Sequence, residues 1–113
     1  MLETGIDIEE ISRFRGALSN RELLKNVFSE REVDYCRAKP NPERHLAARF
    51  CAKEAVIKAT GTKAGFSQIE LLNDKSGKPF ICIKGRRSKK IRCSISHSEK
   101  YAVALVIWEH GRE

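Results

Sequence analysis

The segment from residue 43 to residue 60 constrains the fold most, because it predicts a long helix that is apolar on two sides. At about 100° per residue, Leu46, Phe50 and Ile57 fall within one narrow stripe. A second face consists of small residues, namely Ala48, Ala52, Ala55 and Ala59. Gly61 follows at the position where helices commonly end in a left-handed residue. We therefore expect a central helix whose alanine side lets another element approach closely.

The residues before this helix predict one strand and three shorter helices. Alternation of apolar and polar residues indicates a strand over residues 2–8 with one polar face. A first helix is expected to follow, with Asp7 in the N-cap position. Asn20, and the capping box of Ser29 and Glu32, are expected to open the next two helices. The apolar positions of the first helix are Ile11, Phe14 and Leu18.

The residues after the central helix predict four strands. They are expected over residues 69–72, 80–84, 91–96 and 101–108. A basic loop, Gly85–Lys90, separates the second of these strands from the third. The order of one strand, four helices and four strands favours an α+β fold with a mainly antiparallel sheet. At 113 residues, the whole chain (1–113) is expected to form a single domain.

Hydrophobicity and cysteine spacing exclude several classes of protein. No apolar run approaches the roughly 18 residues of a membrane span, so no membrane association is expected. The first residues show no basic stretch followed by an apolar one, so we expect no secretory signal and a cytoplasmic protein. The four cysteines form no CxxC pair, which argues against zinc and redox motifs and indicates reduced thiols. They are Cys36, Cys51, Cys82 and Cys93.

The net charge of +7 indicates an anionic partner. Nucleic acid, an anionic membrane, a phosphorylated ligand and an acidic protein would each fit, and composition does not choose among them. The loop Gly85–Lys90 is either an exposed turn or a contact to nucleic-acid phosphates. A basic nucleic-acid-binding module is the weaker alternative, because no aromatic cluster for base stacking lies near this loop.

Two carboxylates stand out as candidates for chemistry. Glu54 lies beside the apolar stripe of the central helix, where an unpaired carboxylate is costly. It is either a salt-bridge partner of Lys58, one turn later, or a metal ligand. Asp7 is either a helix N-cap or a ligand at the carboxyl end of a strand. If the two carboxylates meet, Mg²⁺ between them would relieve their repulsion.

Several cations surround Glu54 on or just after the same helix. They are Arg49, Lys53, Lys58 and Lys63. These side chains form either a solvated face or a site for a phosphate-bearing ligand beside a metal ion. His97 follows the predicted strand 91–96, and taken alone it indicates a structural or surface residue.

Three segments read together resemble a known family. They are GIDIEEISRF at 5–14, RFCAKEAVIKATG at 49–61 and SISHSEKYAVALVI at 94–107. In this order they resemble the holo-acyl-carrier-protein synthases, which are small phosphopantetheinyl transferases. The family carries a G-x-D near the N-terminus, an F-x-x-K-E-A-x-x-K-A-x-G helix, and an S-I-S-H type of strand before Y-A-x-A. The resemblance covers most of the chain, although the stretch after Gly61 and the segment 84–92 are shorter than is usual in the family.

The resemblance implies a specific reaction. The family transfers 4′-phosphopantetheine from coenzyme A to a serine of an apo acyl carrier protein in fatty acid biosynthesis, and releases adenosine 3′,5′-bisphosphate. By position, Asp7 and Glu54 are the implied Mg²⁺ ligands, and Lys58 is the implied phosphate contact. These three residues are the candidate catalytic residues, and Glu54 is expected to accept the serine proton, either directly or through a metal-bound water. The implied coenzyme A contacts are Arg49, Lys53, Lys58, Ser96 and His97.

The resemblance also implies partners. It implies a phosphopantetheinyl transferase-like fold and a homotrimer with active sites at the subunit interfaces. The basic surface would then bind the 3′-phosphate of coenzyme A and dock an acidic carrier protein, with no role for nucleic acid. The candidate docking residues are Arg13, Arg15, Arg21 and Lys25. The shortened segments leave open a non-catalytic family member that serves as a binding subunit.

Overall fold

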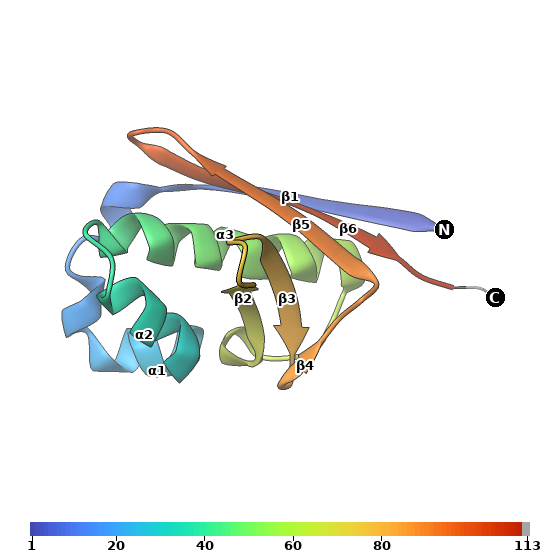
Figure 1. Cartoon of the computed structure of the whole chain (residues 1–113), viewed down its shortest axis with the longest axis horizontal. Coiled ribbons are helices and arrows are strands. Elements are labelled where there is room, and N and C mark those ends of the chain that lie inside the picture. The colour runs from blue at the N-terminus through green and yellow to red at the C-terminus, as the bar shows by residue number, and fades with distance from the viewer. Residues whose placement is uncertain (112–113) are drawn as a thin grey trace.

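The computed structural model describes residues 1–111. Helix α3 (Pro42–Thr60) forms the centre of the molecule (Figure 1). Proline occupies its first turn, and Gly61 ends it with a φ of 68°. Three-stranded sheets pack on two sides of the helix, and every strand pairing is antiparallel. The predicted α+β class and antiparallel character are therefore confirmed, with two small sheets in place of one. No helix in residues 1–111 is both long and apolar enough to cross a bilayer.

The larger sheet has the strand order β1-β6-β5, which places the N-terminal strand at one edge. Its strands are β1 (Leu2–Glu10), β5 (Ile91–His97) and β6 (Tyr101–Glu109). Strand β1 extends two residues beyond the prediction, because Glu9 and Glu10 pair with Ala102 and Tyr101. It follows that Asp7 lies inside a strand, so its prediction as a helix N-cap is wrong.

The smaller sheet has the order β2-β3-β4. Its strands are β2 (Ile69–Asn73), β3 (Pro79–Ile83) and β4 (Arg86–Arg87). The segment predicted as the loop Gly85–Lys90 thus contains a short strand, in which Arg86 and Arg87 pair with Ile83 and Cys82. A turn with positive φ at Lys84 (53°) and Gly85 (83°) returns the chain so that this pairing can form.

The helical region between β1 and α3 differs from the prediction at its start. Two short 3₁₀ turns, η1 (Ile11–Phe14) and η2 (Ala17–Ser19), replace the first predicted helix. Gly16 separates them with a φ of 77°, which no residue inside a right-handed helix adopts. The expected apolar residues still face inward, because Ile11 and Phe14 are buried.

Two regular helices follow, and both begin where the capping residues predict. The Asn20 side chain accepts a hydrogen bond from the Leu23 amide at 3.1 Å and opens α1 (Arg21–Val27). Ser29 and Glu32 form the predicted capping box at the start of α2 (Glu30–Arg37). The Glu32 carboxylate is fully buried, and besides capping α2 it binds a buried lysine that is described below.

Strand β1 turns its polar face toward α3 and its apolar face to solvent. Gly5, Asp7 and Glu9 face the helix, whereas Ile6 and Ile8 are 59 % and 61 % exposed. A Cβ atom at Gly5 would overlap the Ala55 carbonyl oxygen, so glycine is needed for this close approach. The alanine side of the central helix does let another element approach closely, as predicted.

Candidate functional site

Asp7 and Lys58 meet where β1 packs against α3, and we call the space between these two elements the Asp7 crevice. Asp7 is 12 % exposed, and its Oδ1 accepts a long hydrogen bond of 3.4 Å from the Lys58 Nζ. The same Nζ donates to the Ile6 carbonyl at 2.9 Å, which holds the lysine against the strand. Among the described residues, the second oxygen of Asp7, Oδ2, is buried and has no hydrogen-bond partner. A buried carboxylate oxygen without a donor is costly unless a cation or a proton reaches it.

Glu9 adds a third carboxylate to this crevice, and the sequence argument missed it. Burial raises the pKa of Glu9 to about 7, with further contributions from the Asp7 side chain and the charge of Glu54. Arg13 opposes this shift through an ion pair of 2.5 Å. The alternation of side chains along β1 contains the signal, because Asp7 and Glu9 are two residues apart and share a face.

The salt-bridge interpretation, in which Glu54 pairs with Lys58, is wrong. Lys58 pairs with Asp7 across the crevice, and no ion pair to Glu54 occurs within residues 1–111. Glu54 contributes to the raised pKa of Glu9, so its carboxylate lies near the acids of β1. The charges of both carboxylates that the sequence singled out therefore act on Glu9.

The donor set fits a divalent ion that keeps several waters. No group of three His, Cys, Asp or Glu side chains in residues 1–111 is arranged as a complete metal cage. Mg²⁺ needs no such cage, since it is usually held by one or two carboxylates together with waters and substrate phosphates. The unpartnered Oδ2 of Asp7 and the nearby Glu54 supply carboxylate oxygens of that kind.

Cys51 lies close to these acids, and its thiol is expected to be unreactive. Its Sγ donates to the Ala102 carbonyl at 3.3 Å. Burial raises the pKa of the thiol to about 12, and the charges of Asp7 and Glu9 reinforce the shift. All four cysteines, which lie within residues 1–111, are free thiols, as the sequence predicted.

Lys53 has a structural role, which contradicts its prediction as a coenzyme A contact. It is fully buried, and its Nζ donates to the Glu32 carboxylate at 2.5 Å. The carbonyls of Phe66, at 2.9 Å, and Ile69 accept its remaining N–H groups. Glu32 in turn accepts from the Leu71 amide at 2.9 Å, so one buried pair links α2, α3 and β2. No group on this lysine is left for a ligand.

No hydrogen bond or ion pair within residues 1–111 joins Arg49 or His97 to Asp7 or Lys58. Arg49 is 1 % exposed and donates to Asn73 Oδ1 at 2.9 Å, so its contact to a ligand stays a prediction. Burial lowers the pKa of the nearby His45, and the charges of Arg49 and His97 add to the effect.

The candidate residues therefore divide between the two edges of the larger sheet. Asp7 is on edge strand β1, whereas Ser96 and His97 are on the opposite edge strand β5. The register sets Glu9, Ala102 and His97 side by side across the sheet, with β6 between the edges. Within one chain, Lys58 contacts Asp7, and the charges of Asp7 and Glu54 both act on Glu9.

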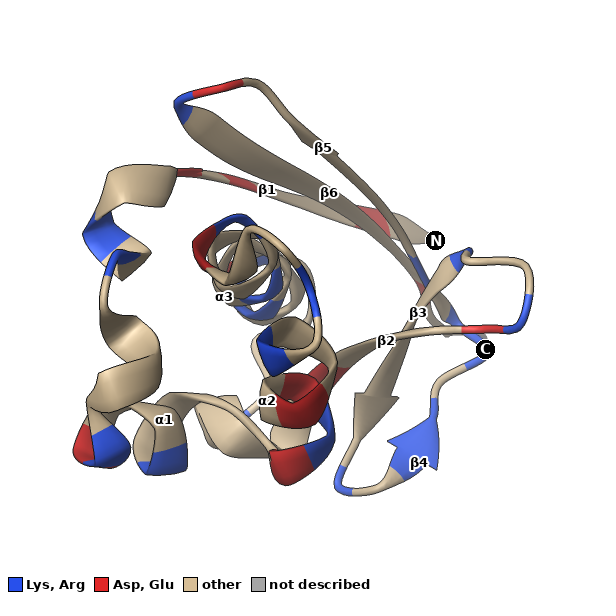
Figure 2. Cartoon of the chain, turned by 60° about the vertical axis from the view of Figure 1, so that its left-hand side comes forward, with Lys and Arg blue, Asp and Glu red and all other residues tan. Residues whose placement is uncertain are grey.

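The predicted docking cations lie on the N-terminal helical region and are exposed (Figure 2). They are Arg13, Arg15, Arg21 and Lys25. Arg13 is 60 % exposed yet bound to Glu9, so it connects this surface with the acidic crevice.

Comparisons with known proteins identify the family of this chain. A family model described as the 4′-phosphopantetheinyl transferase superfamily matches residues 3–106. A holo-[acyl-carrier-protein] synthase of Chloroherpeton thalassium is 43 % identical over 118 residues, covering 96 % of this chain and 98 % of the relative. The synthase of Geotalea daltonii is 41 % identical, covering 94 % and 96 % of the two chains.

Solved structures give the same result. The crystal structure of a holo-(acyl-carrier-protein) synthase from Bacillus anthracis in complex with CoA (3′,5′-ADP) has a TM-score of 0.80 at 33 % identity, covering 96 % of both chains. The ACPS–CoA complex of Chronobacterium ammoniagenes has a TM-score of 0.82 at 29 % identity, covering 99 % of both chains. The chain described here belongs to the 4′-phosphopantetheinyl transferase superfamily.

Proposed function

We propose that this chain transfers 4′-phosphopantetheine from coenzyme A to a serine of an apo acyl carrier protein and releases adenosine 3′,5′-bisphosphate. The pairing of Asp7 with Lys58, and the effect of Glu54 on the neighbouring Glu9, carry the proposal, because they point to two carboxylates and a cation for a diphosphate. The relatives named holo-[acyl-carrier-protein] synthase support it over nearly the whole length of the chain. We place the reaction in the cytoplasm.

Mg²⁺ is the proposed cofactor, with Asp7 and Glu54 as the residues that would hold it. When bound, the ion would offset the negative charge of the coenzyme A diphosphate. The orphaned Oδ2 of Asp7 supports this assignment, because the fold leaves that oxygen buried without a donor.

The side chains around the crevice have separate tasks in this reaction. Lys58 would exchange its long contact with Asp7 for a phosphate oxygen and stabilise the charge that develops there. Glu54 would accept the proton of the attacking serine hydroxyl. Because Lys58 is 55 % exposed, its Nζ can move between strand and substrate without disturbing the core.

A homotrimer would complete the site. The outer face of the larger sheet exposes a group of large apolar residues, namely Leu2, Ile6, Ile8, Tyr101 and Leu105. Contiguous apolar surface of this kind marks a protein interface. A neighbouring copy could bring the Ser96 and His97 edge of its sheet to the Asp7 edge of this one, so that one coenzyme A spans both. Light scattering tests this assembly, and Ile6→Glu is expected to reduce the measured mass to that of one chain.

The acidic carrier would dock on the exposed cations of the N-terminal helical region. Charge complementarity of this kind acts mainly on association. Replacing Arg15 and Arg21 by Glu should therefore raise the KM for the carrier while leaving coenzyme A binding unchanged. Equal losses for both substrates would contradict this docking surface.

Mass spectrometry tests the reaction directly. The protein is incubated with coenzyme A, Mg²⁺ and an apo carrier, and the carrier is expected to gain one phosphopantetheine group. Asp7→Ala and Glu54→Ala should abolish the transfer, whereas Glu30→Ala, which removes an exposed carboxylate of α2, should preserve it. Coenzyme A binding without any transfer would favour a non-catalytic binding subunit, and full activity of Asp7→Ala would exclude the metal assignment.

A further inference from the structure

The positive charge of this protein is concentrated in one short segment that the proposed reaction does not use. Residues 84–92 contain six of the 22 lysines and arginines and none of the 15 acids. The rest of the chain therefore has a net charge of only +1. Figure 2 shows this concentration as the blue strand β4 and the blue residues beside it.

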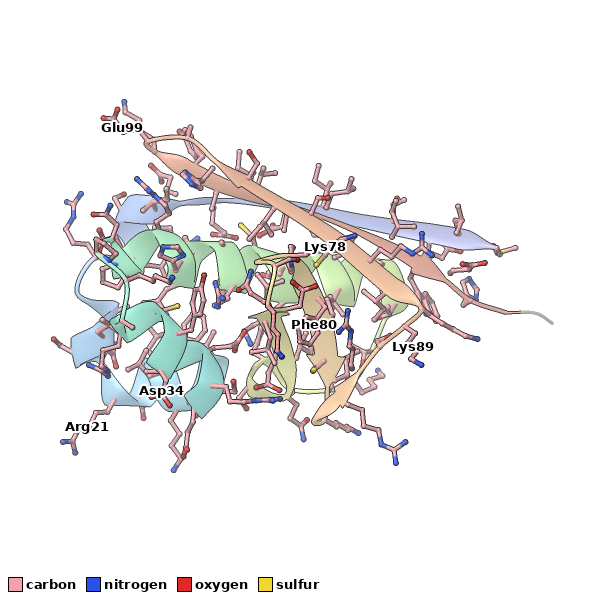
Figure 3. The ribbon with its side chains drawn as sticks, viewed as in Figure 1. Arg21, Asp34, Lys78, Phe80, Lys89 and Glu99 are labelled. Atoms are coloured by element: carbon pink, nitrogen blue, oxygen red, sulfur yellow. The ribbon has the colours of Figure 1, made fainter. Side chains whose placement is uncertain are left out.

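A groove lies where this segment meets the neighbouring strands. It has a volume of about 600 Å³ and is bounded by the β2–β3 turn, β3, β4 and the first half of β5. Four cations line it, namely Lys78, Arg87, Lys89 and Arg92. Figure 3 shows Lys78, Phe80 and Lys89 on this side of the molecule, and Arg21 at the opposite end.

Among residues 1–111, the cations of this groove interact only weakly with carboxylates, and the charge of Arg87 helps to lower the pKa of Asp74. None of the four forms an ion pair within residues 1–111. The one acid in the lining, Asp74, is occupied by its own turn, where its Oδ1 accepts from the Ser76 hydroxyl at 2.7 Å and the Lys78 amide at 3.0 Å. Four like charges around one concave surface repel one another, and a multiply charged anion would relieve that repulsion.

Arg87 is fixed in an orientation suited to phosphate. Its guanidinium lies 4.1 Å from the centre of the Phe80 ring, and its backbone pairs with Cys82 of β3. A guanidinium that stacks on a ring keeps its N–H groups free for bidentate contacts. Phe80 is the single aromatic residue in the lining, and Arg87 already covers one of its faces. The groove therefore lacks the series of stacking surfaces that a single-stranded nucleic acid uses.

We propose that this groove is a binding site for a compact oligophosphate, of the kind carried by nucleoside di- and triphosphates, and that it is separate from the Asp7 crevice. The topology separates the two, because the groove borders β5 and the crevice borders β1, at opposite edges of the sheet. Arg92 is also five residues from His97 along β5, which in an extended strand is on the order of 16 Å.

Calorimetric titration with inorganic tripolyphosphate, without Mg²⁺ and at low salt, tests this site. We expect one tripolyphosphate per chain, and an affinity that falls as salt is added. Arg87→Ala should weaken binding by about tenfold or more, as for the loss of a charged hydrogen bond. Arg86→Ala is the matched control, since Arg86 belongs to the same strand but does not line the groove. Equal losses in both variants, or no binding by the unmodified protein, would overturn the proposal.

Two further titrations locate the ligand and identify its source. Lys58→Ala should bind tripolyphosphate as the unmodified protein does, and a loss equal to that of Arg87→Ala would move the ligand to the Asp7 crevice and overturn the proposal. Tighter binding of ATP than of tripolyphosphate would assign the groove to a nucleotide, whereas equal binding would assign it to the oligophosphate alone. Phe80→Leu retains every charge and should still weaken binding severalfold, because it releases the Arg87 guanidinium. Circular dichroism confirms that each variant is folded.

Discussion

Lys53 and Lys58 are five residues apart on α3, and each is paired with an acid from another element. Lys53 is fully buried, and Glu32 and two carbonyls accept its N–H groups. Lys58 is 55 % exposed and makes a long contact to Asp7, whose second oxygen has no partner in the described structure. One helix thus carries a closed polar network on one side and an incomplete one on the other.

The comparison teaches that hydrogen-bond saturation, rather than charge or motif, separates the two roles. A buried network with every donor and acceptor satisfied is rigid and has no capacity for a ligand. An incomplete network retains both negative charge and orphaned oxygens, which a substrate or ion can satisfy. Sequence proximity to Glu54 suggested a ligand contact for both lysines, and only the pattern of partners distinguishes them.

Lys53→Met should produce the largest effect, because it leaves the Glu32 carboxylate buried without a counter-ion. Breaking a buried pair in this way typically costs about 3–5 kcal/mol of the free energy of unfolding. The matched change Lys58→Met, on an exposed pair, should cost less than about 1 kcal/mol. Urea unfolding of the two variants measures the difference, and similar losses would remove the distinction between the two sides of the helix.

Gly5→Ala should have the next largest effect, and it acts on the incomplete side alone. The added methyl group would overlap the Ala55 carbonyl, so β1 must move away from α3. Overpacking of this kind typically costs about 1–3 kcal/mol. Thermal unfolding measures the loss. Thr4→Ala, at the neighbouring exposed position of β1, is the control and should be close to neutral.

The pH dependence of the free energy of unfolding should reveal the ionisation of Glu9. Its pKa is about 7 in the folded protein against an ordinary value of 4.5, so the folded state binds more protons between these values. The resulting stabilisation is complete below pH 4.5 and is lost as the pH rises through 7. Melting temperatures of the metal-free protein should therefore fall over this range, and Glu9→Gln should remove that component. An unchanged profile in the variant would show that Glu9 ionises normally.

Glu54→Gln should have the smallest effect and the opposite sign. The charge of Glu54 opposes the ionisation of Glu9, and no ion pair in residues 1–111 is lost with it. Without metal, the variant should be as stable as the unmodified protein or up to about 1 kcal/mol more stable, as for residues retained for function. A shift in melting temperature on adding Mg²⁺ and coenzyme A should disappear at the same time. Marked destabilisation would instead make Glu54 a structural residue.

Local signals in the sequence predicted most of the fold. The central helix, its glycine stop, and the caps at Asn20 and Ser29 depend on neighbouring residues, so they could be predicted from short segments. The prediction of the first helix was wrong, because the spacing of apolar residues gives no information on the positive φ of Gly16. The short β4 was missed because its pairing depends on the turn at Lys84, not on hydrophobic alternation.

The site was predictable in part. The motifs singled out Asp7, Glu54 and Lys58, of which the fold pairs Asp7 with Lys58, while the charge of Glu54 acts on Glu9. The second role of Glu32 could not be predicted, because its partner Lys53 is 21 residues away and the two meet only in the folded chain. Glu9 was overlooked because alternation shows which residues share a face, but not which face packs against the helix.

Because β1 and β5 are the two edges of one sheet, the candidate residues on them lie on opposite sides of β6 within a single chain. If neighbouring copies unite the two edges, every working centre disappears when the copies separate. Turnover per chain would then fall steeply on dilution, and the concentration of the protein itself would act as a switch on its rate.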